Sequence, residues 1–251
     1  MAPLVRREDR AGSAVLVLDS PANRNALSRQ VVGELESHLA DLESEPSARA
    51  VVITGSGNTF CAGADLSDPP VQSGPGSFTD LLRRLWDYPK PVVAAVNGHV
   101  RAGGFGLVGV ADVGLCASSA TFALTEVRLG LVPAIISVVL LRRMTPAAAS
   151  RYMLTGETFG PAAAAEAGLV HQVVPDAGLA AAVDDLLETF RGCEPGALRI
   201  TRHLLHRIPA MDVQDGFAAA EEVSRERFAS AEAAEGIASF REKRPPSWAA
   251  S

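Results

Sequence analysis

Short apolar runs alternate with helical patterns along the first two thirds of the chain. Apolar runs bounded by turn residues are typical of buried strands, and here they cover residues 14–18, 50–54, 91–96 and 113–117. Residues 28–42 place their apolar side chains along one side of a helix, and residues 78–88 indicate a second helix. Strands that alternate with helices predict an α/β fold with mostly parallel pairing.

The pattern changes beyond about residue 178. Strand-like runs disappear there, and alanine-rich helical patterns continue to about Arg241, with breaks at Pro195 and Pro209. We therefore predict two parts, a β/α core over residues 1–190 and a C-terminal helical segment over residues 191–251.

Composition and charge narrow the class of protein. The chain has 251 residues, of which 47% are hydrophobic and 21% charged, enough to bury a full core. A net charge of -6 without a dense basic run argues against sequence-independent binding of nucleic acid. The first ten residues are too charged for a signal peptide, and the longest apolar stretch, residues 129–141, is too short to cross a bilayer. We expect a cytoplasmic protein with no membrane or nucleic-acid partner.

Cysteines and histidines indicate no metal site. The three cysteines are far apart and form no CxxC pair: Cys61, Cys116 and Cys193. Cys61 has no base beside it in the sequence, so we do not expect it to be a nucleophile. His203 and His206 have the spacing of a metal pair on one helix, but no third ligand is apparent. His99 adjoins a glycine-rich turn and is a candidate for lining a pocket, whereas the other histidines are interpreted as structural.

The glycine-rich segment after the third strand resembles a dinucleotide-binding fingerprint at first sight. Residues 104–109 match GxGxxG, and Glu126 lies about twenty residues further on. However, the fingerprint needs its glycines directly in the turn after the strand, and seven residues separate Val96 from Gly104. Glu126 also does not close the second strand of such a unit. We therefore reject this interpretation.

Two turns rich in small residues favour a different chemistry. Ala102, Gly103 and Gly104 open a predicted helix, where backbone N–H groups have no partner within the helix. Residues 61–65 form a similar turn after the second strand, and small side chains let a ligand oxygen approach the main chain. Two such turns can direct two N–H donors at one oxygen, which would form an oxyanion hole.

Ordered motifs over most of the chain resemble the enoyl-CoA hydratase/isomerase (crotonase) family. The segments that carry the resemblance are residues 23–28 (NRNALS), 60–66 (FCAGADL), 89–98 with 102–104, 122–133, 154–156 and 164–170. The resemblance implies a spiral β/α core and a C-terminal helical region that forms trimer contacts. It also implies an acyl-CoA substrate, no cofactor beyond the CoA of that substrate, and a homotrimer or a dimer of trimers.

The same resemblance assigns candidate site residues. It implies that the backbone N–H groups of Ala64 and Gly103 form the oxyanion hole and that Glu126 is the catalytic glutamate. Arg24, Ala62, Asp65 and Leu66 are implied to lie along the CoA. Ala26, Ala102 and His99, which are close to the two turns in sequence, are further candidates for binding the substrate. Lys243 matches a basic position that can reach the CoA bound by a neighbouring subunit, and a solvated charge is an equal alternative.

Three acidic residues also have plain structural explanations. Asp65 could simply cap the turn that it follows, and Asp112 is typical of a structural turn acid. Glu126 could be a surface acid that pairs locally with Arg128. The two turns favour a functional role for Glu126.

One position departs from the two-glutamate hydratases of the family. They carry a first carboxylate on the helix after the glycine-rich turn and a second about twenty residues later, and this chain has Gly106 and Glu126 at these positions. Hydration needs a base for the water and a proton for the α carbon, whereas isomerisation needs a single base.

Residues 126–137 are similar to single-glutamate members related to methylglutaconyl-CoA hydratases. We therefore predict an enoyl-CoA hydratase that acts on a 2-enoyl-CoA thioester. A 3,2-enoyl-CoA isomerase is the first alternative, and an acyl-CoA-binding homologue without activity is the second. Residues 67–77, rich in Pro, Ser and Gly, predict a mobile loop, and the sequence there does not indicate the acyl chain.

Overall fold

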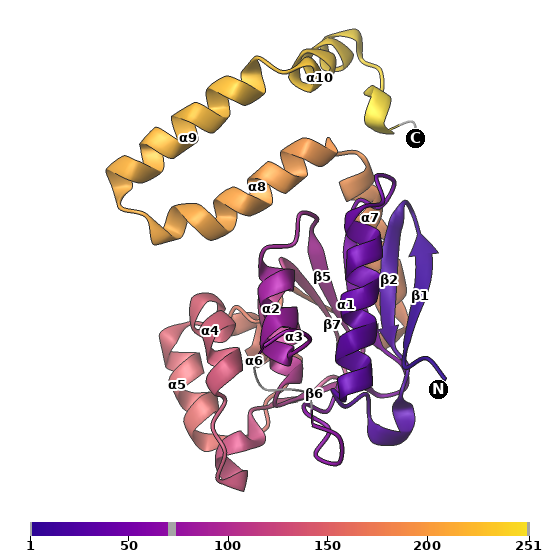
Figure 1. The fold of residues 1–251 in the computed structure, drawn as a ribbon, viewed down its shortest axis with the longest axis vertical. Coiled ribbons are helices and arrows are strands. Elements are labelled where there is room, and N and C mark those ends of the chain that lie inside the picture. The colour runs from indigo at the N-terminus through magenta and orange to yellow at the C-terminus, as the bar shows by residue number, and fades with distance from the viewer. Residues whose placement is uncertain (1, 70–73, 250–251) are drawn as a thin grey trace.

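Two β-sheets form the core of the computed structural model, which describes residues 2–69 and 74–249 (Figure 1). The larger sheet has six strands in the order β1-β2-β3-β5-β7-β9. Its strands are β1 (Val5–Arg10), β2 (Ser13–Leu18), β3 (Val51–Gly55), β5 (Val92–Val96), β7 (Val113–Ala117) and β9 (Gln172–Val174). β1 runs antiparallel to β2, and the other pairs are parallel. The four strands predicted from apolar runs are confirmed.

The smaller sheet has three parallel strands in the order β4-β6-β8. They are β4 (Thr59–Cys61), β6 (His99–Arg101) and β8 (Phe122–Ala123). Each follows a strand of the larger sheet after a short turn, so the chain passes repeatedly from one sheet to the other. This repeat produces the predicted spiral β/α core. The sequence analysis did not predict these strands, because two or three residues are too few for a period to be visible.

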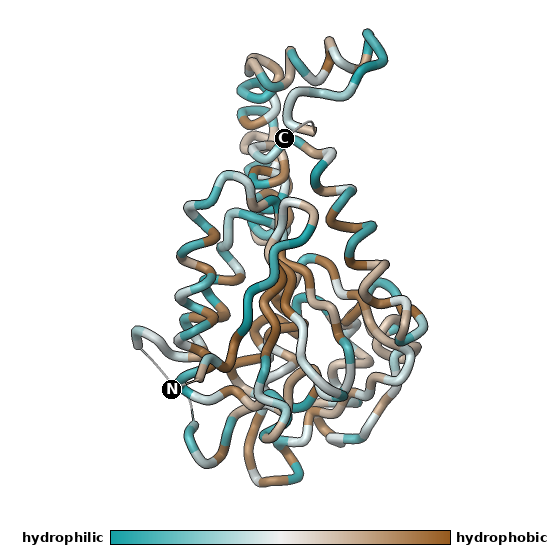
Figure 2. The backbone as a smooth tube through the Cα atoms, turned by 90° about the vertical axis from the view of Figure 1, so that its right-hand side faces the viewer, coloured by the Kyte–Doolittle hydropathy of each residue, from teal (hydrophilic) through white to brown (hydrophobic). Residues whose placement is uncertain are grey.

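Helices cover both faces of the larger sheet. One face packs against α1 (Arg29–Glu43), α2 (Phe78–Trp86) and α3 (Gly104–Val110), and the other against α7 (Leu179–Arg191). Alternate residues of β2 point to opposite faces, so Leu16 joins the first hydrophobic cluster and Val17 the second. Burial on both faces explains why the central strands are continuously apolar, as the brown strands in Figure 2 show.

The predicted helix over residues 28–42 is confirmed. Ser28 caps it, since its hydroxyl accepts a hydrogen bond from the Val31 N–H at 3.2 Å. The remaining helices are α4 (Ala134–Arg143), α5 (Pro146–Thr155), α6 (Pro161–Glu166), α8 (Pro195–Arg207), α9 (Val213–Phe228) and α10 (Ala231–Glu242). Figure 1 shows α8, α9 and α10 at one end of the molecule, beyond the sheets.

Two sequence predictions concern particular segments. Of the predicted loop over residues 67–77, residues 70–73 lie outside the described residues, and the rest forms no helix or strand. Beyond residue 178 the described chain is helical without strands, as expected. No helix in the part of the chain that the structure describes is both long and apolar enough to cross a bilayer.

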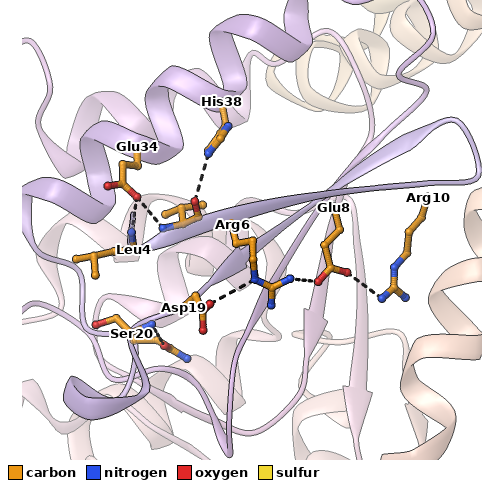
Figure 3. A network of polar contacts seen from close by, with 10 residues as sticks. Leu4, Arg6, Glu8, Arg10, Asp19, Ser20, Glu34 and His38 are labelled. Atoms are coloured by element: carbon orange, nitrogen blue, oxygen red, sulfur yellow. Dashed lines mark hydrogen bonds and ion pairs between the residues drawn. The ribbon is translucent and has the colours of Figure 1, made fainter. Parts of the chain in front are cut away.

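Charged side chains follow the edge strand β1. Arg6 forms ion pairs with Glu8 and Asp19, and Arg10 binds Glu8 at 2.9 Å (Figure 3). From α1, the carboxylate of Glu34 accepts two backbone N–H groups at the start of the strand, each at 2.7 Å. Charges along an edge strand discourage pairing with another chain. They also explain why the sequence analysis missed β1, which has no apolar run.

A buried polar cluster joins α8 to the core. Arg202 is 5% exposed and donates from Nε to Asp112 Oδ2 at 2.6 Å. Its other nitrogens donate to carbonyl oxygens at the end of α2 and just beyond it, those of Leu85, Trp86 and Tyr88. Asp112 also accepts the Val92 N–H at 2.7 Å. The structural interpretation of Asp112 is therefore confirmed.

His206 belongs to the same cluster. Its ring stacks on Trp86 with a centroid distance of 4.1 Å, and its Nε2 lies 3.5 Å from Asp112 Oδ1. His206 therefore has a structural role on α8, and its contacts there involve Trp86 and Asp112 rather than a metal ion.

Candidate active site

Three segments that follow the strands of the small sheet meet at one edge. The strands are parallel, so their carboxyl ends lie on the same side. β4 leads into Ala62–Ala64, β6 into Ala102 and Gly103, and β8 into Thr125 and Glu126. The small sheet therefore brings both small-residue turns and Glu126 to a common edge.

The two turns pack directly against each other. Gly63 has a φ of +89°, and a Cβ added there would lie 2.8 Å from Ala102 Cβ and 3.1 Å from Gly103 N. A Cβ on Gly103 would lie 3.6 Å from Ala64 N. Ala102 has a φ of 44°, which is uncommon for a residue with a side chain and marks local strain. Small residues are thus required because the two backbones approach closely.

The amides of Ala64 and Gly103 are left unused by the fold. Ala64 forms a parallel bridge with Leu27, but its own N–H takes no part in that bridge. The two hydrogen bonds of the bridge run from Leu27 N to Gly63 O at 2.7 Å and from Asp65 N to Leu27 O at 3.0 Å. Gly103 precedes α3, where helix geometry provides no acceptor for its N–H. Among the described residues, neither amide donates a hydrogen bond. Two such donors on adjacent turns can bind one oxygen from two sides.

Glu126 lies half-buried in a short 3-10 helix, Thr125–Leu129, that follows β8. Its Oε2 is buried and has no hydrogen-bond partner among the described residues. Burial raises the pKa of this carboxyl group. Arg128 turns away and donates to Thr155 O at 3.0 Å, so local pairing with Glu126 is not what the structure shows. A buried carboxylate oxygen without a partner is typical of a functional group.

Asp65 caps its own turn. Its Oδ1 accepts the N–H groups of Ser67 at 2.9 Å and Asp68 at 3.3 Å, and its Oδ2 accepts from Asn23 Nδ2 at 3.2 Å. The hydrogen bonds from Ser67, chiefly, lower the pKa of Asp65. These contacts confirm that Asp65 caps the turn that it follows. Its hydrogen bond with Asn23 also links the first turn to residue 23.

Other candidate residues surround the first turn. Arg24 is exposed, and its carbonyl oxygen accepts the Ala62 N–H at 3.1 Å. Ala26 is buried, whereas the side chain of Leu66 is 78% exposed. The structure thus brings these residues to the same turn. Leu27, which the sequence analysis did not single out, contacts both turns: it bridges Ala64, and its Cδ1 lies 3.3 Å from the position of a Gly103 Cβ.

Two candidates lie outside this group. His99 is in β6 with its Nδ1 2.9 Å from Thr121 Oγ1. Lys243 follows the last residue of α10 in a left-handed conformation, and Figure 1 shows α10 at the end of the molecule opposite to β6. Within one chain, Lys243 is therefore not brought to the edge that carries Glu126.

Cys61 is fully buried at the start of the first turn. Burial raises the pKa of its thiol to about 12, so the thiolate needed for nucleophilic attack is not formed at neutral pH. Within residues 2–69 and 74–249, no three His, Cys, Asp or Glu side chains are grouped so that they could hold a metal ion.

Apolar side chains fill the space beside Gly106. A Cβ added there would lie 3.0 Å from Ile136 Cγ2 and Phe78 Cζ, and 3.1 Å from Leu82 Cδ1. All three side chains are buried, and they come from α2 and α4. The sequence analysis missed them because only the packing of three helices brings them together. We call these three residues the apolar wall.

Known proteins resemble this chain over nearly its whole length. The family model for enoyl-CoA hydratase/isomerase matches residues 8–251. A Thermus thermophilus protein provisionally named enoyl-CoA hydratase is 38% identical over 242 residues, which is 93% of this chain and 96% of that protein. Hydroxycinnamoyl-CoA hydratase-lyase of Pseudomonas fluorescens is 34% identical over 211 residues, 79% of this chain and 76% of its own.

Solved structures show the same likeness. The crystal structure of an enoyl-CoA hydratase of Mycobacterium smegmatis has a TM-score of 0.91 and 29% sequence identity, and the match covers 98% of this chain and 99% of that one. Taken with the spiral core and the paired turns, these matches show that the chain belongs to the enoyl-CoA hydratase/isomerase family, a family of enzymes with the crotonase fold.

Proposed function

We propose that this protein is an enoyl-CoA hydratase that adds water across the double bond of a 2-enoyl-CoA thioester. The observation that carries the proposal is the common edge of the small sheet, which holds two backbone amides without an acceptor and the buried Oε2 of Glu126 without a donor among the described residues. The amides of Ala64 and Gly103 bind the thioester oxygen and stabilise the charge that develops on it. Glu126 takes a proton from the water that attacks carbon 3, and its carboxyl group delivers a proton to carbon 2.

The CoA part of the substrate binds along the first turn in this proposal. Arg24 presents an exposed guanidinium there, which suits a phosphate group. Ala26, Ala62, Asp65 and Leu66 lie in or beside the first turn, and Ala102 lies in the second. His99 lies at the start of β6 and would contact the substrate only from there. The chemistry requires no cofactor beyond the CoA of the substrate.

Isomerisation is the second candidate, and Gly106 is the observation that favours it. The apolar wall occupies the place of a second carboxylate, so Glu126 acts without that partner. A single base can take a proton from carbon 2 of a 3-enoyl thioester and return it to carbon 4 while the two amides hold the dienolate.

Two acyl-CoA substrates distinguish the candidates. The protein would be incubated with crotonyl-CoA and with 3-hexenoyl-CoA while the absorbance of the 2,3-enoyl thioester is followed. Loss of absorbance with crotonyl-CoA is expected and establishes hydration. A gain with 3-hexenoyl-CoA alone would make the protein an isomerase. No change with either, despite measurable binding, would indicate a binding protein without activity.

A carboxylate introduced at residue 106 is expected to destabilise the protein without speeding hydration. In Gly106→Glu the new side chain meets the apolar wall, and overpacking of this kind costs about 1 to 3 kcal/mol before the charge is considered. We expect a lower midpoint of urea unfolding and no gain in hydration rate. Gly33→Glu is the matched control, because a Cβ at this helical position meets no atom within 4 Å. A faster and equally stable Gly106→Glu variant would contradict this prediction.

The rate is expected to depend on the ionisation of Glu126. A base must be deprotonated, so the rate falls as the pH falls through its pKa. Burial raises that pKa above the ordinary value of 4.5, so the acidic limb of kcat/KM against pH should lie above 4.5. A limb at or below this value would show that an exposed carboxylate, or no carboxylate, controls the rate.

The C-terminal segment, residues 191–251, is proposed to form the subunit contacts of a trimer or of a dimer of trimers. Its helices α9 and α10 expose large apolar side chains: Val213, Phe217, Phe228, Ile237 and Phe240. Light scattering is expected to give three or six times the mass of the 26.2 kDa chain. Assembly would also let Lys243 reach the CoA bound by a neighbouring subunit. A monomer at micromolar concentration would contradict both proposals.

A further inference from the structure

Arg101 lies where the two turns of the proposed oxyanion hole meet. It is the last residue of β6 and directly precedes the second turn. Its carbonyl oxygen lies against the first turn, since a Cβ added to Gly63 would come within 3.1 Å of it. Val100, the residue before it, is fully buried in the core, and successive side chains of a strand point to opposite faces. The guanidinium of Arg101 therefore leaves the core face and contacts the neighbouring strand.

The guanidinium holds Thr121, the residue that precedes β8. Its Nη1 donates to Thr121 O at 2.7 Å and to Val100 O at 2.8 Å, and its Nη2 donates to Thr121 Oγ1 at 2.8 Å. Because an arginine only donates, Thr121 Oγ1 accepts this bond and has its own hydrogen available for His99 Nδ1 at 2.9 Å. The planar guanidinium thus fixes the end of β6 to the start of β8 in one orientation.

These partners of Arg101 are all neutral. Arg101 is half-buried, and burial lowers the pKa of its guanidinium without an opposing effect from a carboxylate among the described residues. A buried charge without an acidic partner destabilises a fold. Such a group beside a proposed active site indicates a functional role.

The strained residue Ala102 needs support on the side of Arg101. A left-handed conformation of a residue with a side chain persists only where the surrounding contacts hold it. The N–H of Ala102 donates to Ala123 O of β8 at 3.3 Å, which is long for such a bond. The shorter hydrogen bonds from Arg101 to Thr121 support the same junction between β6 and β8. Gly103, which carries the second proposed oxyanion amide, follows at once.

From these contacts we propose that Arg101 is a positioning residue, which sets the spacing between the Gly103 amide and Glu126. Gly103 follows Arg101 by two residues. Glu126 follows Thr121 by five, so the hydrogen bonds between Arg101 and Thr121 control both groups. The proposal rests on the function proposed above and adds a residue that acts without touching the substrate. A displacement of about 1 Å in an active site can lower the rate about 100-fold.

Arg101→Lys tests the geometry and keeps the charge. The ammonium of lysine is a point charge, which does not hold a carbonyl and a hydroxyl oxygen in one fixed plane. We expect kcat with crotonyl-CoA to fall by about 10- to 100-fold. The Kd of butyryl-CoA, measured by calorimetric titration, should change by less than about threefold, because the CoA is proposed to bind along the first turn. An unchanged kcat would overturn the proposal, and so would a loss of affinity as large as the loss of kcat.

Arg143→Lys is the matched control. Arg143 is also half-buried and also donates to carbonyl oxygens, those of Ala111 and Leu169, but these residues belong to neither turn. This variant should lower the midpoint of urea unfolding and leave kcat unchanged. An equal loss of kcat in both variants would show that a general loss of stability lowers the rate, and would overturn the proposal.

The carbonyl stretch of a bound saturated thioester separates this proposal from the proposed reaction. Hydrogen bonds to the thioester oxygen lower the infrared frequency of its C=O group, so isotope-labelled butyryl-CoA reports the oxyanion hole without turnover. We expect the original protein and Arg143→Lys to lower this frequency, and Arg101→Lys to lose part of the shift. If the original protein does not hydrate crotonyl-CoA but Arg101→Lys still loses the shift, hydration is refuted and the positioning role stands. An equal shift in the original protein and Arg101→Lys overturns that role, whatever the reaction.

Thr121 provides a milder test, which also decides if Arg101→Lys does not fold. Thr121→Val keeps the shape of the side chain but removes the oxygen that accepts from Arg101, whereas Thr121→Ser keeps this oxygen. We expect kcat to be about 3- to 10-fold lower in the valine variant than in the serine variant, the effect of one hydrogen bond. Equal kcat values for the two variants would overturn the proposal.

Discussion

Glu126→Gln is expected to lower kcat by about 10²- to 10⁴-fold, the range that a positioned general acid or base contributes. The amide has nearly the same shape as the carboxyl group but cannot accept and return a proton. Acyl-CoA affinity should change little, because the proposed contacts with the thioester oxygen come from the backbone of Ala64 and Gly103. Turnover would be measured with crotonyl-CoA, and affinity by calorimetric titration with butyryl-CoA.

Stability distinguishes this catalytic role from a structural one. The pKa of Glu126 is raised in the folded protein, so this group stabilises the fold when protonated, and that contribution is lost as the pH rises through the raised pKa. At neutral pH the ionised Glu126 side chain therefore destabilises the fold. The Glu126→Gln variant should have a melting temperature no lower than that of the original protein. Glu166→Gln is the control, since Glu166 is an exposed residue at the end of α6. Loss of activity together with a lower melting temperature would point to a structural role.

Arg202→Ala is expected to destabilise the protein by about 3 to 5 kcal/mol, the cost of removing one partner of a buried ion pair. The substitution leaves the Asp112 carboxylate without its guanidinium partner and removes the donors to three carbonyl oxygens at and beyond the end of α2. It also weakens the attachment of α8 to the core. Urea unfolding of the two proteins would measure the difference.

An exposed arginine on the same helix is the control. Arg199 lies nearly one turn before Arg202, and Arg199→Ala should change stability by less than about 0.5 kcal/mol, as surface substitutions usually do. A cost below 1 kcal/mol for Arg202→Ala would show that the cluster contributes little.

The pH dependence of this pair has a defined sign. Burial acts to raise the pKa of Asp112, but the hydrogen bond with His206 and the charge of Arg202 outweigh it and lower the pKa below the ordinary value of 3.8. The pair therefore stabilises the fold above pH 3.8, and this contribution is lost as the pH falls through the lowered pKa. The difference between Arg202→Ala and the original protein should shrink in that acidic range.

The sequence predicted strands correctly where burial on both faces produces a long run of apolar residues. The four central strands of the larger sheet, β2, β3, β5 and β7, are covered on both faces, so their residues are continuously apolar and visible as runs. The small sheet left no such signal, because β4, β6 and β8 have three, three and two residues. Yet this sheet is what brings the two turns and Glu126 to one edge.

The sequence by itself determined the family, the two small-residue turns, Glu126 and the absence of a carboxylate at residue 106. These are properties of residue type and spacing, and each is readable from a few neighbouring positions. Only the tertiary structure decided that Arg128 turns away from Glu126, that the apolar wall closes the space beside Gly106 and that Arg202 holds Asp112. Such contacts join residues as far apart as 90 positions, and they arise from the packing of whole helices, which no local pattern encodes.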